Sequence, residues 1–186
     1  MLTNSAAGLA SALSVAGSAE RKSLLAAFDG ALVRLQADAS LSRADRLMAL
    51  VARVQLAQLD APGKDKPSAT PAALRAEVRD MAVRFDREIT DGYERQAVIT
   101  TAAWALEQAG LMEDSDALLK ANLAKSHSPY YLMADLADNA KKRGDKAAAL
   151  DWNAQAFDKS EGPATRLQWG ARYLGMLIEL APQDAQ

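Results

Sequence analysis

Apolar residues recur three and four positions apart along most of the chain, and short polar or glycine-containing segments separate these runs. Such spacing places the apolar side chains on one face of an α-helix. Runs of β-branched residues are nearly absent, and the closest is at residues 97–101. The pattern therefore predicts an all-α fold of about eight helices. Their expected starts lie near residues 2, 18, 42, 70, 93, 114, 129 and 145, and a further helical unit is expected to begin after Gly162-Pro163.

Several helix boundaries are predicted from capping residues. Ser18 and Ser42 are N-cap residues by type, and an acidic residue follows Ser42 by three positions, as in a capping box. Thr70 is expected to cap the next helix, with Pro71 at its first position, where a missing N–H costs nothing. Residues 61–69 contain two prolines, a glycine and alternating charges, so we expect a linker there.

The second half of the chain repeats with a period of 34 residues. The repeated positions are apolar or small: Ile99, Met133 and Leu167; Ala102, Leu136 and Gly170; Ala103, Ala137 and Ala171; Leu106, Ala140 and Leu174. Gly110 and Gly144 share the spacing, and each is expected to end the first helix of its unit. Ala149 and Ala156 are small enough to let a second helix pack closely against the first.

This period and these small residues resemble the tetratricopeptide-repeat (TPR) family over residues 93–181, about half of the chain. The large aromatic residues usual at the core of the family's first helix are replaced here by aliphatic ones. The resemblance implies antiparallel helix pairs stacked as a right-handed solenoid. We expect an N-terminal helical segment at 1–60, the linker at 61–69 and TPR-like repeats at 70–186, joined as one continuous helical domain.

Composition limits the possible functions. Hydrophobic residues make up 49% of the 186-residue chain and aromatic residues only 5%, so the apolar content is mainly alanine and leucine. A formal net charge of −2 argues against a nucleic-acid or anionic-lipid partner. No stretch is apolar enough for membrane insertion, and the absence of cysteine excludes thiol chemistry within the chain. The first 19 residues lack a basic residue, so we interpret them as a helix rather than a signal peptide.

A second resemblance covers most of the chain. Residues 43–60 (RADRLMALVARVQLAQLD) and 70–111 are similar to the helical C-terminal region of some proteobacterial thioredoxin-fold thiol-disulfide interchange proteins. In that family a secreted thioredoxin domain with a Cys-x-x-Cys motif lies upstream. This chain has no cysteine, so no redox activity is transferred to its residues. The resemblance implies an accessory domain of a longer bacterial periplasmic protein, with the thioredoxin-like domain as a partner; without it, a cytoplasmic protein is expected.

If the repeats stack as TPR units do, the first helix of each unit faces a groove. The residues expected there are Thr100, Trp104, Glu107 and Gln108 in one unit, Tyr131, Asp138, Lys141 and Lys142 in the next, and Gln168, Arg172 and Met176 in the last. Trp104 and Tyr131 would anchor an extended peptide, while Arg172 and Lys141 would meet its carboxylates. Alternatively, Trp104 packs against an N-terminal helix and the charged residues only solubilise the face.

No catalytic constellation is evident in the sequence. His127, the only histidine, lies in a Ser-His-Ser-Pro turn without the neighbours of a metal site or a catalytic triad, so we interpret it as a surface residue. No phosphate loop or known hydrolase motif occurs. The sequence favours a protein-interaction module that binds a peptide or partner domain with no cofactor or metal. The alternatives are an all-α enzyme with an unrecognised site and a structural or oligomerisation domain.

Overall fold

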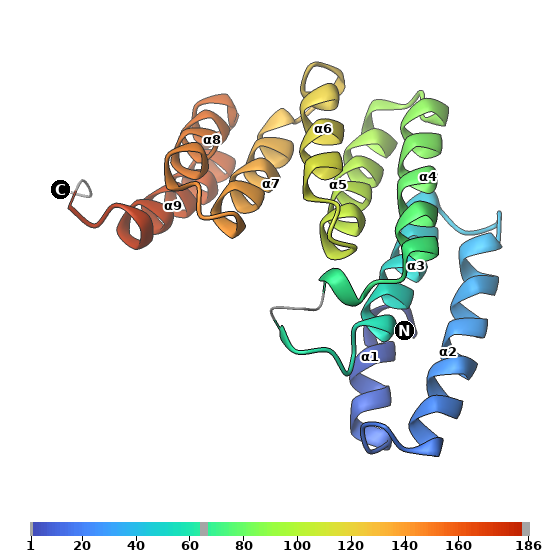
Figure 1. The fold of residues 1–186 in the computed structure, drawn as a ribbon. Helices are drawn as coiled ribbons and strands as arrows, with labels where there is room; N and C mark the ends of the chain where they lie inside the picture. Colours follow the sequence, from blue (N-terminus) through green and yellow to red (C-terminus); the bar gives the residue numbers. More distant parts are fainter. Residues whose placement is uncertain (1, 64–66, 184–186) are drawn as a thin grey trace. The chain divides into compact units, whose positions relative to one another are not determined.

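The computed structural model describes residues 2–63 and 67–183, and Figure 1 shows its ribbon. Within these residues nine α-helices are present with the 3₁₀ helices η2 (Pro67–Ala69) and η3 (Leu123–Lys125), and no strand occurs. The α-helices are α1 (Leu2–Leu13), α2 (Ala19–Ala37), α3 (Arg43–Ala57), α4 (Ala72–Glu88), α5 (Gly92–Gln108), α6 (Met112–Asn122), α7 (Pro129–Lys142), α8 (Lys146–Lys159) and α9 (Pro163–Leu180). The prediction of an all-α fold is confirmed. Residues 64–66 of the predicted linker lie outside the described residues.

Two of the three predicted N-caps are confirmed. The hydroxyls of Ser18 and Ser42 each accept a hydrogen bond from the backbone N–H three residues later. The prediction for Thr70 is wrong, because Pro71 is the N-cap residue of α4. Thr70 is instead 2% exposed, and its hydroxyl accepts a hydrogen bond of 2.7 Å from the Gln58 side-chain amide. The Thr70 hydroxyl is therefore engaged in a buried hydrogen bond and does not cap α4.

Glycine ends α5 and α7, as predicted. Gly110 and Gly144 both have φ of +79°, a left-handed conformation that L-residues adopt only with strain. At each end the glycine N–H bonds a carbonyl three residues back, and the next residue's N–H bonds one five residues back. The same pair of bonds thus closes both helices and satisfies their last carbonyls.

The described residues form two compact units, of which unit 1 comprises residues 1–89 and 101–115. Its core joins α1, α2 and α3 and consists largely of alanine and leucine: Ala6, Ala10, Leu32, Ala49, Ala52 and Leu56. Small side chains on α1 and α3 allow these helices to approach closely. Arg21, 4% exposed, holds the α1–α2 turn to the end of α3 by bonding Ser14 twice and Asp60 once.

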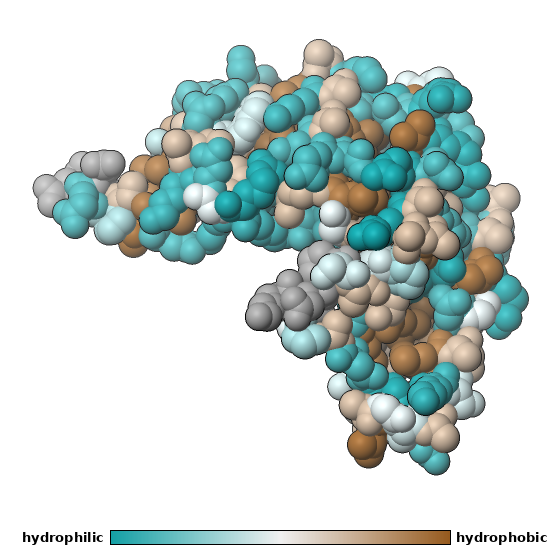
Figure 2. All heavy atoms as spheres, viewed as in Figure 1, coloured by the Kyte–Doolittle hydropathy of each residue, from teal (hydrophilic) through white to brown (hydrophobic). Residues whose placement is uncertain are grey.

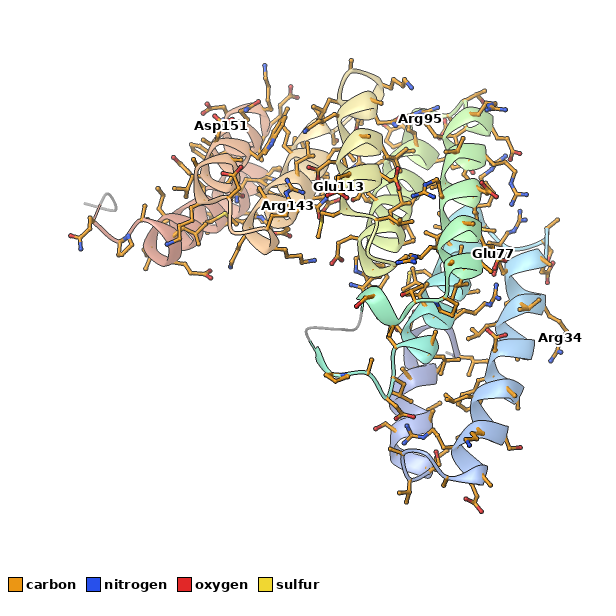
Figure 3. All side chains as sticks on the ribbon, viewed as in Figure 1. Arg34, Glu77, Arg95, Glu113, Arg143 and Asp151 are labelled. Carbon is orange, nitrogen blue, oxygen red and sulfur yellow. The ribbon has the colours of Figure 1, made fainter. Side chains whose placement is uncertain are left out.

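Unit 2 comprises residues 90–100 and 116–186. Two adjoining clusters pack α7 against α8 and α9: Met133, Ala134, Ala156 and Trp169, and Ala137, Ala140, Ala149 and Met176. Polar contacts add to them, since Asp116 accepts from Asn139 and pairs with Arg143, which Figure 3 labels. The core of unit 2 therefore fixes α7 on more than one side.

In α9 the repeat predicts the wrong buried face. Leu167 and Leu174, expected at repeated core positions, are 76% and 51% exposed, whereas Trp169 and Met176 are buried. Gly170 is compatible with this orientation, because a Cβ placed there would lie 3.1 Å from the Phe157 ring. The lack of a side chain at Gly170 thus allows α9 to approach α8 closely while the repeated leucines stay outside the core.

Candidate functional site

One face of α7 carries polar and aromatic residues that do not enter the core. Tyr131, Asp135, Asp138 and Lys142 follow one another at intervals of four, three and four residues, which places them on one side of the helix. The residues between them supply the buried positions of α7. We call Tyr131, Asp135 and Asp138, together with Trp169 and Arg172 of α9, the α7–α9 face.

Aromatic rings join the two helices at one end of this face. The ring centroids of Tyr131 and Trp169 are 5.3 Å apart with an interplanar angle of 87°, and Tyr130 lies within 5.6 Å of both. Edge-to-face pairs of this kind stabilise packing beyond the area they bury. Tyr131 is 42% exposed, Tyr130 is partly buried and Trp169 is only 5% exposed, so the Tyr131 ring is the most accessible of the cluster. The indole N–H of Trp169 has no hydrogen-bond acceptor in the described part of the chain.

Arg172 connects α9 to α7 and α8. Its guanidinium donates to Asp138 Oδ1 at 2.7 Å, to Asn153 Oδ1 at 3.3 Å and to the Ala134 carbonyl at 3.4 Å. The same group lies 5.8 Å from the centroid of the Trp169 ring. Arg172 therefore orders the face from within, and its charge is largely matched by Asp138.

Asp135 is the least satisfied charged group of the face. It is half-buried, and no residue in the described ranges gives its carboxylate a hydrogen bond or an ion pair. Burial and, to a smaller extent, the neighbouring carboxylate of Asp138 raise the pKa of Asp135 to about 7, against the opposing effect of the Arg172 and Lys142 charges. Near neutral pH the protonated and ionised forms are therefore both populated, and a cation placed beside the carboxyl would favour its ionised form.

Some of the other residues predicted to line a groove have partners within the chain, and the rest lie exposed on α5 or α9. Lys141 pairs with Glu179 at 2.6 Å, and the Thr100 hydroxyl donates to a carbonyl of its own helix. Trp104, on α5 in unit 1, is 37% exposed, and Glu107 accepts a hydrogen bond from Gln108. Gln168 is exposed on α9. The use of any of these residues in partner binding stays a prediction.

The prediction for Met176 is wrong. Its side chain is 7% exposed in the cluster that contains Ala137 and Ala149, and its sulfur accepts a hydrogen bond from Asn153 at 2.7 Å. Met176 lies on the side of α9 that faces the core of unit 2, together with Trp169.

Sequence reasoning missed Asp135 and Trp169 as members of the face. Helical spacing alone places Asp135 between Tyr131 and Asp138 on the same side of α7. The lack of a partner for its carboxylate, however, depends on where α8 and α9 direct their side chains. Trp169 is buried, and its unsatisfied N–H has no counterpart in the sequence pattern.

Unit 1 contains a cavity of about 460 Å³ between α2, α3 and α4. Leu25, Leu56 and Leu74 line its apolar part. In the lower right of Figure 2, hydrophobic residues are visible among hydrophilic ones over α2 and its neighbours. The volume falls within the range of small-molecule sites.

The polar end of this cavity is internally paired. Arg53 donates to Asp29 at 2.9 Å, to Gln36 at 2.7 Å and to Glu77, labelled in Figure 3, at 2.8 Å. Burial acts to lower the pKa of Arg53, but its bonds to the two carboxylates outweigh burial and hold that pKa above its ordinary value. These charged groups are already paired with one another, whereas the Asp135 carboxylate is not. A ligand would therefore find a free charge at Asp135 rather than in the cavity.

Other features of the described residues point to no further chemistry. His127 is exposed, and its ring centroid lies 5.1 Å from that of Tyr93. No three carboxylate or imidazole groups in the described ranges are placed to hold a metal ion. None of the described helices combines the length and apolar character needed to cross a lipid bilayer.

Comparison with known proteins found no family model, no curated protein and no solved structure that matches the chain.

Proposed function

We propose that this chain is a protein-interaction domain in which the α7–α9 face binds a peptide or a partner domain. In this proposal α5–α6 and α7–α8 are TPR-like antiparallel pairs. Two observations support the pairing: the positions that repeat between α5 and α7 are buried in both helices, and the same glycine turn closes each. The single observation that carries the function is the Asp135 carboxylate, half-buried and unpaired beside the exposed ring of Tyr131.

These two side chains suit a basic side chain of the partner. A lysine ammonium or arginine guanidinium over the Tyr131 ring gains a cation–π attraction, and Asp135 supplies the opposite charge. An unpaired, partly buried carboxylate costs folding free energy when it is ionised. A bound cation would remove that cost, which is why we place the recognition element at Asp135 rather than at the already paired Asp138.

The test is selection of peptides from a random displayed library on the immobilised chain. We expect enriched peptides to carry lysine or arginine. Tyr131→Ala and Asp135→Asn should each weaken binding of a selected peptide roughly five- to thirtyfold, about 1–2 kcal/mol. Asp151→Asn, which removes an exposed carboxylate of α8, is the matched control and should leave affinity unchanged.

The pH dependence provides a second readout by fluorescence anisotropy. Because a basic ligand prefers ionised Asp135, whose pKa is about 7, its affinity should be higher near pH 8 than near pH 6, and the difference should vanish in Asp135→Asn. Trp104→Ala tests whether α5 takes part in peptide binding. Enrichment without basic residues, or binding that neither Tyr131→Ala nor Asp135→Asn changes, would overturn the assignment.

A further inference from the structure

The outer side of α9 carries an apolar stripe that nothing in the described residues covers. Large and small uncharged side chains lie along it at helical spacing: Ala164, Leu167, Ala171, Leu174, Gly175 and Ile178. Leu167, Leu174 and Ile178 are 76%, 51% and 57% exposed. The stripe lies opposite Trp169 and Met176, through which α9 contacts the core of unit 2. α9 is thus apolar on two opposite sides, and only one of them is buried.

The internal repeat indicates what packs on such a face. Leu167, Ala171 and Leu174 stand 34 residues after Met133, Ala137 and Ala140. Those three residues of α7 are buried in the clusters to which α8 contributes its alanines. The equivalent face of α7 is therefore covered by other helices, which contribute both small and large apolar side chains, and a helix would fit the stripe on α9 in the same way.

The stripe is complementary to itself. Leu167 and Ile178 are equally distant in sequence from the midpoint between residues 172 and 173, and so are Ala171 and Leu174. In an antiparallel pair of α9 helices about a twofold axis, Leu167 would meet Ile178, and Leu174 would fill the space above Ala171. No charged residue lies within the stripe, so the two copies approach without desolvating an ion. We infer that the α9 stripe is a homodimer interface and that its occupant is α9 of a second copy of this chain.

Sedimentation velocity of the full chain, from micromolar to millimolar concentration, tests the inference. We expect a monomer–dimer equilibrium. Leu174→Glu, which places two carboxylates near the twofold axis, should raise the dimer Kd roughly tenfold or more. Val83→Glu is the matched control, because Val83 is also 51% exposed but lies on α4 of unit 1, and it should leave the Kd unchanged.

Cross-linking provides a measurement that does not depend on a destabilising charge. The chain has no cysteine, so Ala171→Cys introduces a single thiol beside the twofold axis. A short bismaleimide should then give a covalent dimer, while Val83→Cys should not. Circular dichroism checks that each variant folds. A wild-type chain that stays monomeric throughout, and so leaves the stripe to another partner, would overturn the inference, as would a dimer that Leu174→Glu does not weaken.

Discussion

Asp135→Asn isolates the cost of holding an unpaired carboxylate in unit 2. The pKa of this group rises from an ordinary value of 3.8 to about 7. At about 1.36 kcal/mol for each pKa unit, the folded state bears at most about 4 kcal/mol once the group is ionised. Since the side chain keeps some contact with water, we expect about 1–2 kcal/mol. Asparagine has nearly the same shape and no charge, so the variant should recover that amount.

The sign follows from proton binding in the two states. Below about pH 3.8 Asp135 is neutral in both the folded and the unfolded chain, and the wild type and the variant should have similar free energies of unfolding. Between pH 3.8 and about 7 only the unfolded chain releases the proton, so the stability of the wild type falls as pH rises. Above about pH 7 the full difference is present and becomes constant.

Urea denaturation of both proteins across this range, followed by circular dichroism, measures the difference directly. Subtracting the two curves removes the titration of every other group. A carbon-13 NMR titration of the Asp135 carboxyl reports its pKa in the folded chain. A difference that does not change with pH, or an asparagine variant less stable than the wild type near pH 8, would refute the reasoning about burial and Asp138.

Three other predictions concern stability and are measured by thermal or urea denaturation. Gly144→Ala should cost about 1–2 kcal/mol of stability because the φ of Gly144 is +79°. Gly8→Ala in α1, where an added Cβ has no neighbour within 4 Å, should instead stabilise the fold by about 0.5–1 kcal/mol. Equal effects of the two substitutions would contradict the assigned turn. Arg53→Met should cost about 1–3 kcal/mol at low salt by leaving its two carboxylate partners unmatched, and a neutral result would show that these bonds contribute nothing. Ser42→Ala should cost about 1 kcal/mol as a lost N-cap, and Ser23→Ala, at an exposed position inside α2, should be close to neutral; similar losses in both would refute the cap.

The sequence predicts the parts of this fold that depend on local chemistry. The residues that start and stop helices, such as Ser42 and Gly144, act on their own backbone, so their roles can be read without knowing the packing. Thr70 shows the limit of that reading, because its hydroxyl bonds Gln58, which only the tertiary structure brings near it. Local propensity identified the cap candidate, and a buried contact decided its use.

The candidate site is less predictable because it depends on which side chains lack a hydrogen-bond or ion-pair partner in the folded chain. Tyr131 was recognisable as an exposed aromatic residue on a helix face, and its 42% exposure agrees. Arg172 and Lys141 were expected to meet a partner's carboxylates, yet each holds a carboxylate of its own chain. The resemblance to thioredoxin-associated domains and the expected interaction function stay predictions.

Gln58 also constrains how the chain can be made and divided. Its side-chain amide donates to the Gln108 carbonyl, 50 residues later, as well as to Thr70. Unit 1 takes up residues 101–115 only after residues 90–100, which belong to unit 2, have been synthesised. During synthesis, the Gln58 amide therefore cannot form its hydrogen bond to Gln108 until that later segment has been added to the chain. For the same reason no single proteolytic cut yields two intact halves, and truncation after residue 89 should expose buried surface rather than release a finished domain.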